Sequence, residues 1–187
     1  MPSKDRHTGN VSPEFVLLGF LLAGPSHGYD LHQRFAAELG QVWHLSQSQS
    51  YAILKRLEVR GDISAQVIEQ EKLPARQMLR LTESGRQRFF AWLESGIGRT
   101  ARSIRLEFLT RSYFTRLHRP ENLAQIHDAQ WKEVESTIER LESLLAHLPP
   151  DQIFNRLSLD LRLQQMRLIR NWMGEMRTQF HIPESGL

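Results

Sequence analysis

Residues 45–63, LSQSQSYAILKRLEVRGDI, constrain the fold of this chain more than any other segment. Apolar residues recur at helical spacing through Ile53, Leu54 and Leu57. Ser46 is followed three residues later by a glutamine, which is the pattern of a capping box. Gly61 stands where helices commonly end, and the residues after it alternate between apolar and polar. The segment therefore predicts a helix followed directly by a β-strand.

Short elements are expected on both sides of this helix. Pro13 suits the first position of an earlier helix, Gly40 ends a second one, and Thr82 is a good N-cap for a later one. A charged turn at 69–74 joins two strands. The expected elements are helices at 13–23, 28–39 and 83–95 and strands at 63–67 and 77–82. Three helices, a hairpin and a helix in this order predict a winged helix-turn-helix domain.

The second half of the chain is almost entirely helical in its patterning. Helices are expected at about 103–117, 120–147 and 151–180. Gly96-Ile97-Gly98 marks the boundary between the halves. We therefore expect a flexible N-terminus at 1–12, a winged helix-turn-helix domain at 13–95 and a helical C-terminal dimerisation domain at 99–187. The fold class is mainly α with a small β-hairpin wing.

Composition excludes several classes of protein. The chain has no cysteine, which excludes disulfides, zinc ribbons and thiol catalysis. No apolar run is long enough to span a membrane, and the N-terminus lacks the apolar core of a signal peptide, so we expect a cytoplasmic protein. His27, His32 and His44 lack metal-ligand spacing, and no phosphate loop or catalytic motif is present. We expect neither an enzyme nor a metal or other cofactor.

The helix of residues 46–61 has the chemistry of a DNA-reading helix. Its apolar face points inward, which leaves five candidates for contacts with double-stranded DNA: Gln47, Ser48, Ser50, Tyr51 and Lys55. Glutamine and serine suit base edges, whereas tyrosine and lysine suit phosphate oxygens. The net charge of +3 is modest, so such binding must rest on local placement of basic residues. The alternative is a solvated helix with an uncharged polar start.

The expected wing carries two further candidates, Lys72 and Arg76. A wing commonly contacts phosphates or the minor groove, for which arginine is well suited. Glu69 and Glu71 lie close in sequence and weaken the local positive field. The alternative is an ordinary charged surface turn.

Three motifs in order resemble the PadR family of transcriptional regulators: HGYDL at 27–31, Y-x-x-L-K-R-L-E-x-x-G at 51–61 and R-x-x-x-R-L-T-x-x-G-R at 76–86. The match covers about 13–93. The resemblance implies that Tyr51 and Lys55 approach the DNA backbone. The chain departs from the family at Ser48, Gln49 and Ser50, where Gly-Thr or Gly-Ser and an apolar residue are frequent. It departs again at Leu79, where an aromatic residue is frequent.

The last two helices predict a homodimer. The helix at 120–147 has a 4-3 apolar spacing, as in a heptad repeat. The last helix has two apolar stripes, which a small domain cannot easily cover alone. We expect dimerisation through 156–180, with four residues as the candidates: Leu161, Leu168, Trp172 and Met173. The alternative is a self-contained three-helix bundle.

Three tryptophans are candidates for a ligand site: Trp92, Trp131 and Trp172. Family resemblance implies that some members respond to phenolic acids or flat hydrophobic drugs, so a small aromatic effector is a candidate partner. The more ordinary interpretation is that these residues belong to cores and interfaces.

Two functional hypotheses follow. The first is a ligand-responsive repressor that binds a palindromic operator as a homodimer. The second is a protein-interaction adaptor that uses a winged-helix scaffold without sequence-specific DNA binding. The polar and basic face of the helix at 46–61 favours the first, because an adaptor does not need it.

Overall fold

The computed structural model describes residues 12–70 and 73–183, without the side chains of 68–76. The expected flexible segment 1–12 and the expected wing residue Lys72 therefore lie, apart from Ser12, outside the described residues. Within the described residues the chain forms two compact units, one of residues 12–96 and one of residues 97–183.

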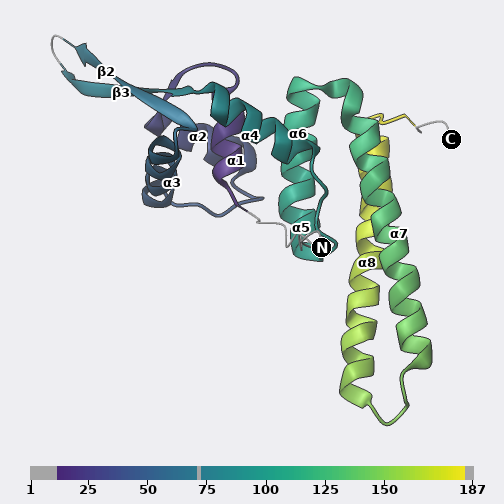
Figure 1. The fold of residues 1–187 in the computed structure, drawn as a ribbon. Helices are drawn as coiled ribbons and strands as arrows, with labels where there is room; N and C mark the ends of the chain where they lie inside the picture. The colour runs from purple at the N-terminus through teal and green to yellow at the C-terminus, as the bar shows by residue number, and fades with distance from the viewer. Residues whose placement is uncertain (1–11, 71–72, 184–187) are drawn as a thin grey trace, which may run out of the picture. The chain divides into compact units, whose positions relative to one another are not determined.

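The N-terminal unit has a winged helix-turn-helix fold, as predicted (Figure 1). A three-stranded antiparallel sheet has the order β1-β3-β2. The elements are α1 (Glu14–Leu21), β1 (Ser26–His27), α2 (Gly28–Leu39), α3 (Gln47–Arg60), β2 (Ile63–Gln70), β3 (Leu73–Leu81) and α4 (Glu83–Glu94).

Two details of the sheet differ from the sequence expectation. The strand β1 was not predicted, because two residues carry no alternation; it forms by pairing with Met78 and Leu79 of β3. The turn is also shorter than the expected 69–74, since Gln70 pairs with Leu73. Near the turn of the hairpin the sequence is mostly charged, so it lacks the alternation of apolar and polar residues that predicts a strand. Backbone pairing rather than apolar side chains defines these strand ends.

The core of the unit is built around α1. Val16, Leu17 and Leu18 are fully buried, and every residue of α1 is buried. A helix that is apolar on all sides must be covered on all sides, and α2, α3 and α4 all contact α1. Phe15 stacks on Trp92 of α4 with ring centroids 4.6 Å apart. The central helix therefore sets the positions of the other three.

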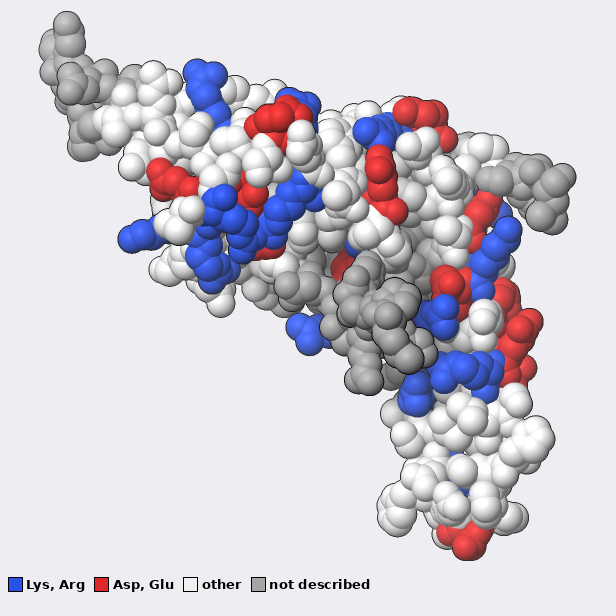
Figure 2. Space-filling view, in the orientation of Figure 1, with Lys and Arg blue, Asp and Glu red and all other residues white. Residues whose placement is uncertain are grey.

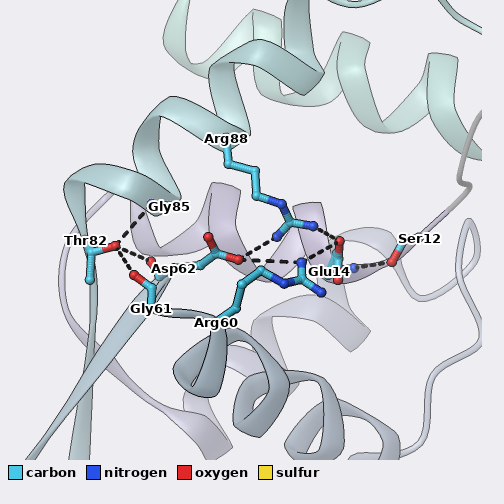
Figure 3. Close-up of polar contacts among 8 residues, drawn as sticks. All are labelled: Ser12, Glu14, Arg60, Gly61, Asp62, Thr82, Gly85 and Arg88. Atoms are coloured by element: carbon cyan, nitrogen blue, oxygen red, sulfur yellow. Dashed lines mark hydrogen bonds and ion pairs between the residues drawn. The ribbon is translucent and has the colours of Figure 1, made fainter. Parts of the chain in front are cut away.

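A four-residue ion cluster joins the start of α1, the middle of α4 and the end of α3 (Figure 3). Arg88 of α4 pairs with Glu14 of α1 and, at 2.7 Å, with Asp62 directly after α3. Arg60, at the end of α3, lies 3.4 Å from Glu14 and 3.6 Å from Asp62. Both carboxylates are buried, which requires paired cations. The cluster therefore holds the C-terminal end of α3 against α1 and α4.

The same region connects the wing to α4. Gly61 has φ 80°, a left-handed conformation that turns the chain from α3 toward β2. The Thr82 hydroxyl donates to the Asp62 carbonyl oxygen at 2.9 Å, and the Gly85 N–H donates to the Thr82 hydroxyl at 3.1 Å. A Cβ on Gly85 would lie 2.0 Å from the Asp62 carbonyl oxygen, so only glycine allows this approach. The base of the wing is thereby fixed to α4.

The C-terminal unit is helical. Its elements are α5 (Ala101–Ser103), the π-helix η1 (Ile104–Phe108), α6 (Leu109–His118), the 3-10 helix η2 (Pro120–Asn122), α7 (Leu123–His147) and α8 (Ile153–Gln179). The helices α7 and α8 run antiparallel to each other (Figure 1). No helix among the described residues is both long and apolar enough to cross a membrane.

The apolar 4-3 spacing of α7 is used inside this unit. Val134, Ile138 and Leu141 are buried in a core that also contains Leu163 and Met166 of α8. His127, another member of the spacing, is fully buried and lies 2.9 Å from the carbonyl oxygen of Met173 through its Nε2. This spacing therefore packs α7 onto α8.

The residues expected at a dimer surface separate into two groups. Leu161 and Leu168 are 59% and 70% exposed. Met173 is fully buried and Trp172 is half-buried, and both pack with the α7–α8 core. The expectation of a free Met173 side chain is thus wrong, because this helix turns one of its two apolar stripes toward α7.

Replacing Arg88 by methionine should lower the free energy of unfolding by about 2–4 kcal/mol, because two buried carboxylates lose their shared cation. Urea denaturation measures this. Arg86→Met is the matched control, since Arg86 is exposed and lies 3.9 Å from Glu83. The control should change stability by less than about 0.5 kcal/mol. Equal effects of the two substitutions would contradict the importance of the ion cluster.

Candidate nucleic-acid interface

The helix α3 is well defined at both ends. The Gln49 N–H donates to the Ser46 hydroxyl at 3.2 Å, and the Ser46 N–H donates to the Gln49 side-chain oxygen at 2.8 Å. The predicted capping box is therefore confirmed. At the other end, the Gly61 N–H bonds to carbonyl oxygens of the last turn. These caps stabilise a helix whose first turn is exposed.

One face of α3 is buried and the opposite face is free. The buried residues are Ser50, Ile53, Leu54 and Leu57. The exposed residues include Gln47, Ser48, Ala52, Lys55 and Val59. With 3.6 residues per turn, Ser48, Ala52 and Lys55 lie along the middle of the free face. An apolar side holds the helix in the unit while a polar side remains available to a partner.

Basic side chains gather over α3 (Figure 2). The helix carries Lys55, Arg56 and Arg60, all of them exposed. Arg60 belongs to the ion cluster, so its charge is partly neutralised. Lys55 and Arg56 therefore supply most of the positive charge that α3 offers to an anionic partner.

Ser50 lies elsewhere than expected. Its side chain is fully buried, and its hydroxyl is 2.9 Å from Nδ1 of His32 on α2. The prediction that Ser50 shares the exposed face is therefore wrong. The helical phase places position 50 with Ile53, Leu54 and Leu57, against α2. The departure from the family pattern at this position thus concerns packing between helices.

A groove of about 920 Å³ runs beside α3. The start of α2, one side of α3 and the sheet form its walls, through residues that include Tyr29, Tyr51, Lys55, Glu58 and Leu79. Tyr51 is 45% exposed, and its ring packs over Gly28, where a Cβ would lie 2.9 Å from the ring. Tyr51 is therefore held against α2 while part of its ring remains accessible.

Sequence reasoning missed three exposed residues near these candidates. Ala52 lies on the free face of α3, where a small apolar side chain suits a thymine methyl group. Arg56 is exposed on one side of the same helix, and Tyr29 is 54% exposed at the start of α2. Ala52 gives no polar signal in the sequence. Arg56 and Tyr29 stand inside the motifs that carried the resemblance and could have been found there.

Near the end of the wing, the structure describes the backbone of residues 68–70 and 73–76 but not their side chains. Arg76 pairs with Ile68 in the β2–β3 hairpin, but its side chain, like the whole of Lys72, lies outside the described residues. Arg80, farther from the tip, is exposed and pairs with Ser64. The contacts predicted for Lys72 and Arg76 remain predictions.

The three candidate tryptophans do not all belong to one unit. Trp92 packs in the N-terminal unit against Phe15 and Phe89. Trp131 stacks on His127 in the C-terminal unit, with ring centroids 6.1 Å apart. Trp172 packs edge-on against Phe108 in the same unit. In the described part of the chain, no group of three histidine, aspartate or glutamate side chains is placed to hold a metal ion.

Comparison with known proteins identifies the N-terminal unit. Residues 17–91 match the model of the transcriptional regulator PadR-like family. The negative transcriptional regulator PadR of Bacillus subtilis (strain 168) is 35% identical over 103 residues, which cover 54% of this chain and 55% of that relative. The chain thus matches about half the length of this curated relative.

Solved structures give weaker similarities over most of the chain. The crystal structure of Bacillus subtilis PadR in complex with operator DNA covers 89% of this chain and 98% of that one, at 26% identity and a TM-score of 0.43. The complex of the same protein with p-coumaric acid covers 90% and 95%, at 25% identity and a TM-score of 0.41.

Replacing Ser46 by alanine should lower the free energy of unfolding by about 1 kcal/mol, because the capping box is lost. Amide exchange at Gln49 should accelerate, since its N–H loses its acceptor. Ser48→Ala is the matched control: Ser48 is exposed within the helix and should change stability by less than about 0.5 kcal/mol. Unchanged exchange at Gln49 in the Ser46 variant would contradict the cap geometry.

Proposed function

We propose that this chain, whose residues 17–91 match the model of the PadR-like family of transcriptional regulators, is a repressor that binds a palindromic operator as a homodimer. The 35% identical relative is named a negative transcriptional regulator, which supports repression over activation. We place its action in the cytoplasm, where its DNA target would lie.

The observation that carries the proposal is the free face of α3. Gln47, Ser48 and Ala52 offer an amide, a hydroxyl and a methyl group of the sizes that read base edges in a major groove. Lys55 and the accessible part of Tyr51 lie beside them and suit phosphate oxygens. Because the caps and the ion cluster fix both ends of α3, these groups are presented from a rigid helix.

The wing would add contacts to this interface. In a winged helix-turn-helix, the hairpin lies beside the recognition helix and reaches the neighbouring phosphates or minor groove. Arg76 and Lys72 are our candidates for these contacts, and exposed Arg80, farther along β3, is a further one. Ser50 is no longer among the candidates, because it is buried.

A homodimer would supply the second recognition helix. Four exposed apolar residues follow one another along α8 at spacings of three, four and seven: Phe154, Leu157, Leu161 and Leu168. A monomer that leaves such a stripe in water loses the free energy of burying it, and a second copy can cover it. Two recognition helices about 34 Å apart would then read the two halves of a palindrome.

The proposal includes a small-molecule effector. The relative of known structure has been solved with p-coumaric acid. In the C-terminal unit, Trp131, Trp172 and Phe108 form an aromatic group with the buried His127. We propose a small aromatic effector, with Trp131 and Trp172 as candidate contacts in the C-terminal unit. Trp92 is a separate candidate in the N-terminal unit.

Lys55→Ala should weaken binding to the operator about tenfold and lower the salt dependence by about 0.9 in log–log slope, because one phosphate contact is lost. Tyr51→Phe should weaken it less, because only a hydroxyl is removed. The operator is first recovered from a random duplex library with the full chain, and its presence upstream of the protein's own gene is then tested by footprinting.

Lys132→Ala provides the matched control, because Lys132 is an exposed lysine on α7. It should leave the affinity and the salt slope unchanged. If the full chain recovers no sequence from the library, the repressor proposal fails, and the adaptor hypothesis gains. If both α3 variants bind as the wild type does, the assignment of α3 as the reading helix is wrong.

Leu161→Glu should raise the dissociation constant of the homodimer at least about tenfold, because a charge is placed in an apolar contact. Analytical ultracentrifugation over a range of concentrations measures this. Lys132→Gln changes the net charge by the same amount and should have no effect. A wild-type chain that sediments as a monomer would contradict the dimer, and a variant that dimerises normally would exclude this part of α8 from the interface.

A further inference from the structure

The contact between α2 and α3 combines apolar packing with a hydrogen bond between two side chains. The buried residues of α3 are Ser50 and three aliphatic residues, and those of α2 include Leu31 and Phe35. Within this contact His32 Nδ1 and Ser50 Oγ lie 2.9 Å apart and share a hydrogen bond. Ser50 is fully buried and His32 is half-buried, so the bond is shielded from water on the side of α3.

A hydrogen bond in this place constrains the orientation of α3 against α2, because it depends on angle, whereas apolar contacts do not. Aliphatic side chains tolerate small rotations and shifts of one helix against another, since their contacts have no preferred angle. A buried hydroxyl without a partner is destabilising, so the helices are favoured only in the register that brings Ser50 to His32. The pair therefore favours one rotation of α3 about its own axis.

The rotation of α3 matters for Tyr51, the next residue along the chain. Gly28 and His32 are four residues apart and lie on the same face of α2. Gly28 receives the ring of Tyr51, because a Cβ there would be 2.9 Å from the ring, and His32 receives the hydroxyl of Ser50. One face of α2 thus holds two successive residues of α3.

We propose that His32 is a positioning residue for DNA recognition: through Ser50 it sets the rotation at which α3 presents Gln47, Ser48 and Tyr51 to the duplex. This inference rests on the proposed function. It assigns a role to a histidine outside the recognition helix, and it explains why a serine stands at a buried position of this chain. Loss of the bond should reduce sequence discrimination more than overall attraction to DNA, which depends on charge.

The test compares specific with non-specific affinity in the full chain. Dissociation constants for the duplex recovered with the wild type and for a scrambled duplex of equal length are measured at one salt concentration, well below the melting temperature. The variants are His32→Leu, Ser50→Ala, the double variant His32→Leu/Ser50→Ala, and His32→Asn, which keeps a polar atom near the position of Nδ1. Gln33→Leu on the exposed side of α2 is the matched control.

In His32→Leu the specific affinity should fall about tenfold while affinity for the scrambled duplex stays within about twofold. The double variant should recover thermal stability, because no buried polar group is left unpaired, yet it should keep the reduced discrimination. His32→Asn should restore most of the discrimination between the two duplexes. Gln33→Leu should discriminate between them as the wild type does.

A purely structural role predicts a different pattern, in which DNA discrimination follows thermal stability across the series. Wild-type discrimination in the stable double variant would therefore overturn the positioning role of His32 and leave the repressor proposal intact. Failure of the wild type itself to distinguish the two duplexes would instead overturn the proposed function, and this inference with it.

Discussion

The pairing of Arg88 with Glu14 and Asp62 is the interaction on which the rest of the N-terminal unit depends. Two buried carboxylates on different elements share one guanidinium, so α1, α4 and the segment after α3 must meet at one place. Arg60 joins them from the last turn of α3. Burying charge is unfavourable unless the geometry of pairing is good, and this requirement makes the junction specific as well as stable. The end of α3 and the base of the wing are thereby placed together.

The junction holds the C-terminal end of α3, whereas other contacts hold its N-terminal end. The capping box stabilises the first turn, the ring of Tyr51 packs over Gly28, and Ser50 bonds to His32. Ion pairs therefore hold one end of α3 and contacts with α2 hold the other. The free face between them carries the small uncharged side chains of Ser48 and Ala52 together with the basic side chain of Lys55. In a DNA-reading helix, contacts with phosphates provide affinity and contacts with base edges provide sequence selectivity, and this surface has groups suited to both.

Local patterns predicted most of this fold, and the errors arose where a partner distant in sequence decides the outcome. The capping box and Gly61 predicted both ends of α3, because caps are local chemistry. Ser50 was misplaced because a serine in a polar run resembles an exposed residue, and its partner His32 lies 18 residues away. The strand β1 exists only through its pairing with β3. Met173 was expected at an outer surface because apolar stripes on a helix do not reveal which one faces the neighbouring helix.

Photocross-linking of the full chain to its selected duplex, with 5-iodouracil placed at each thymine in turn, tests the central claim most directly. If α3 is the reading helix, cross-linked peptides from within a half-site should map to residues 47–55, with Tyr51 the favoured aromatic acceptor. Cross-links at the flanks should map to the wing. Cross-links confined to α1, α4 or α8 would contradict the account, because they would show that a different face of the protein contacts the bases.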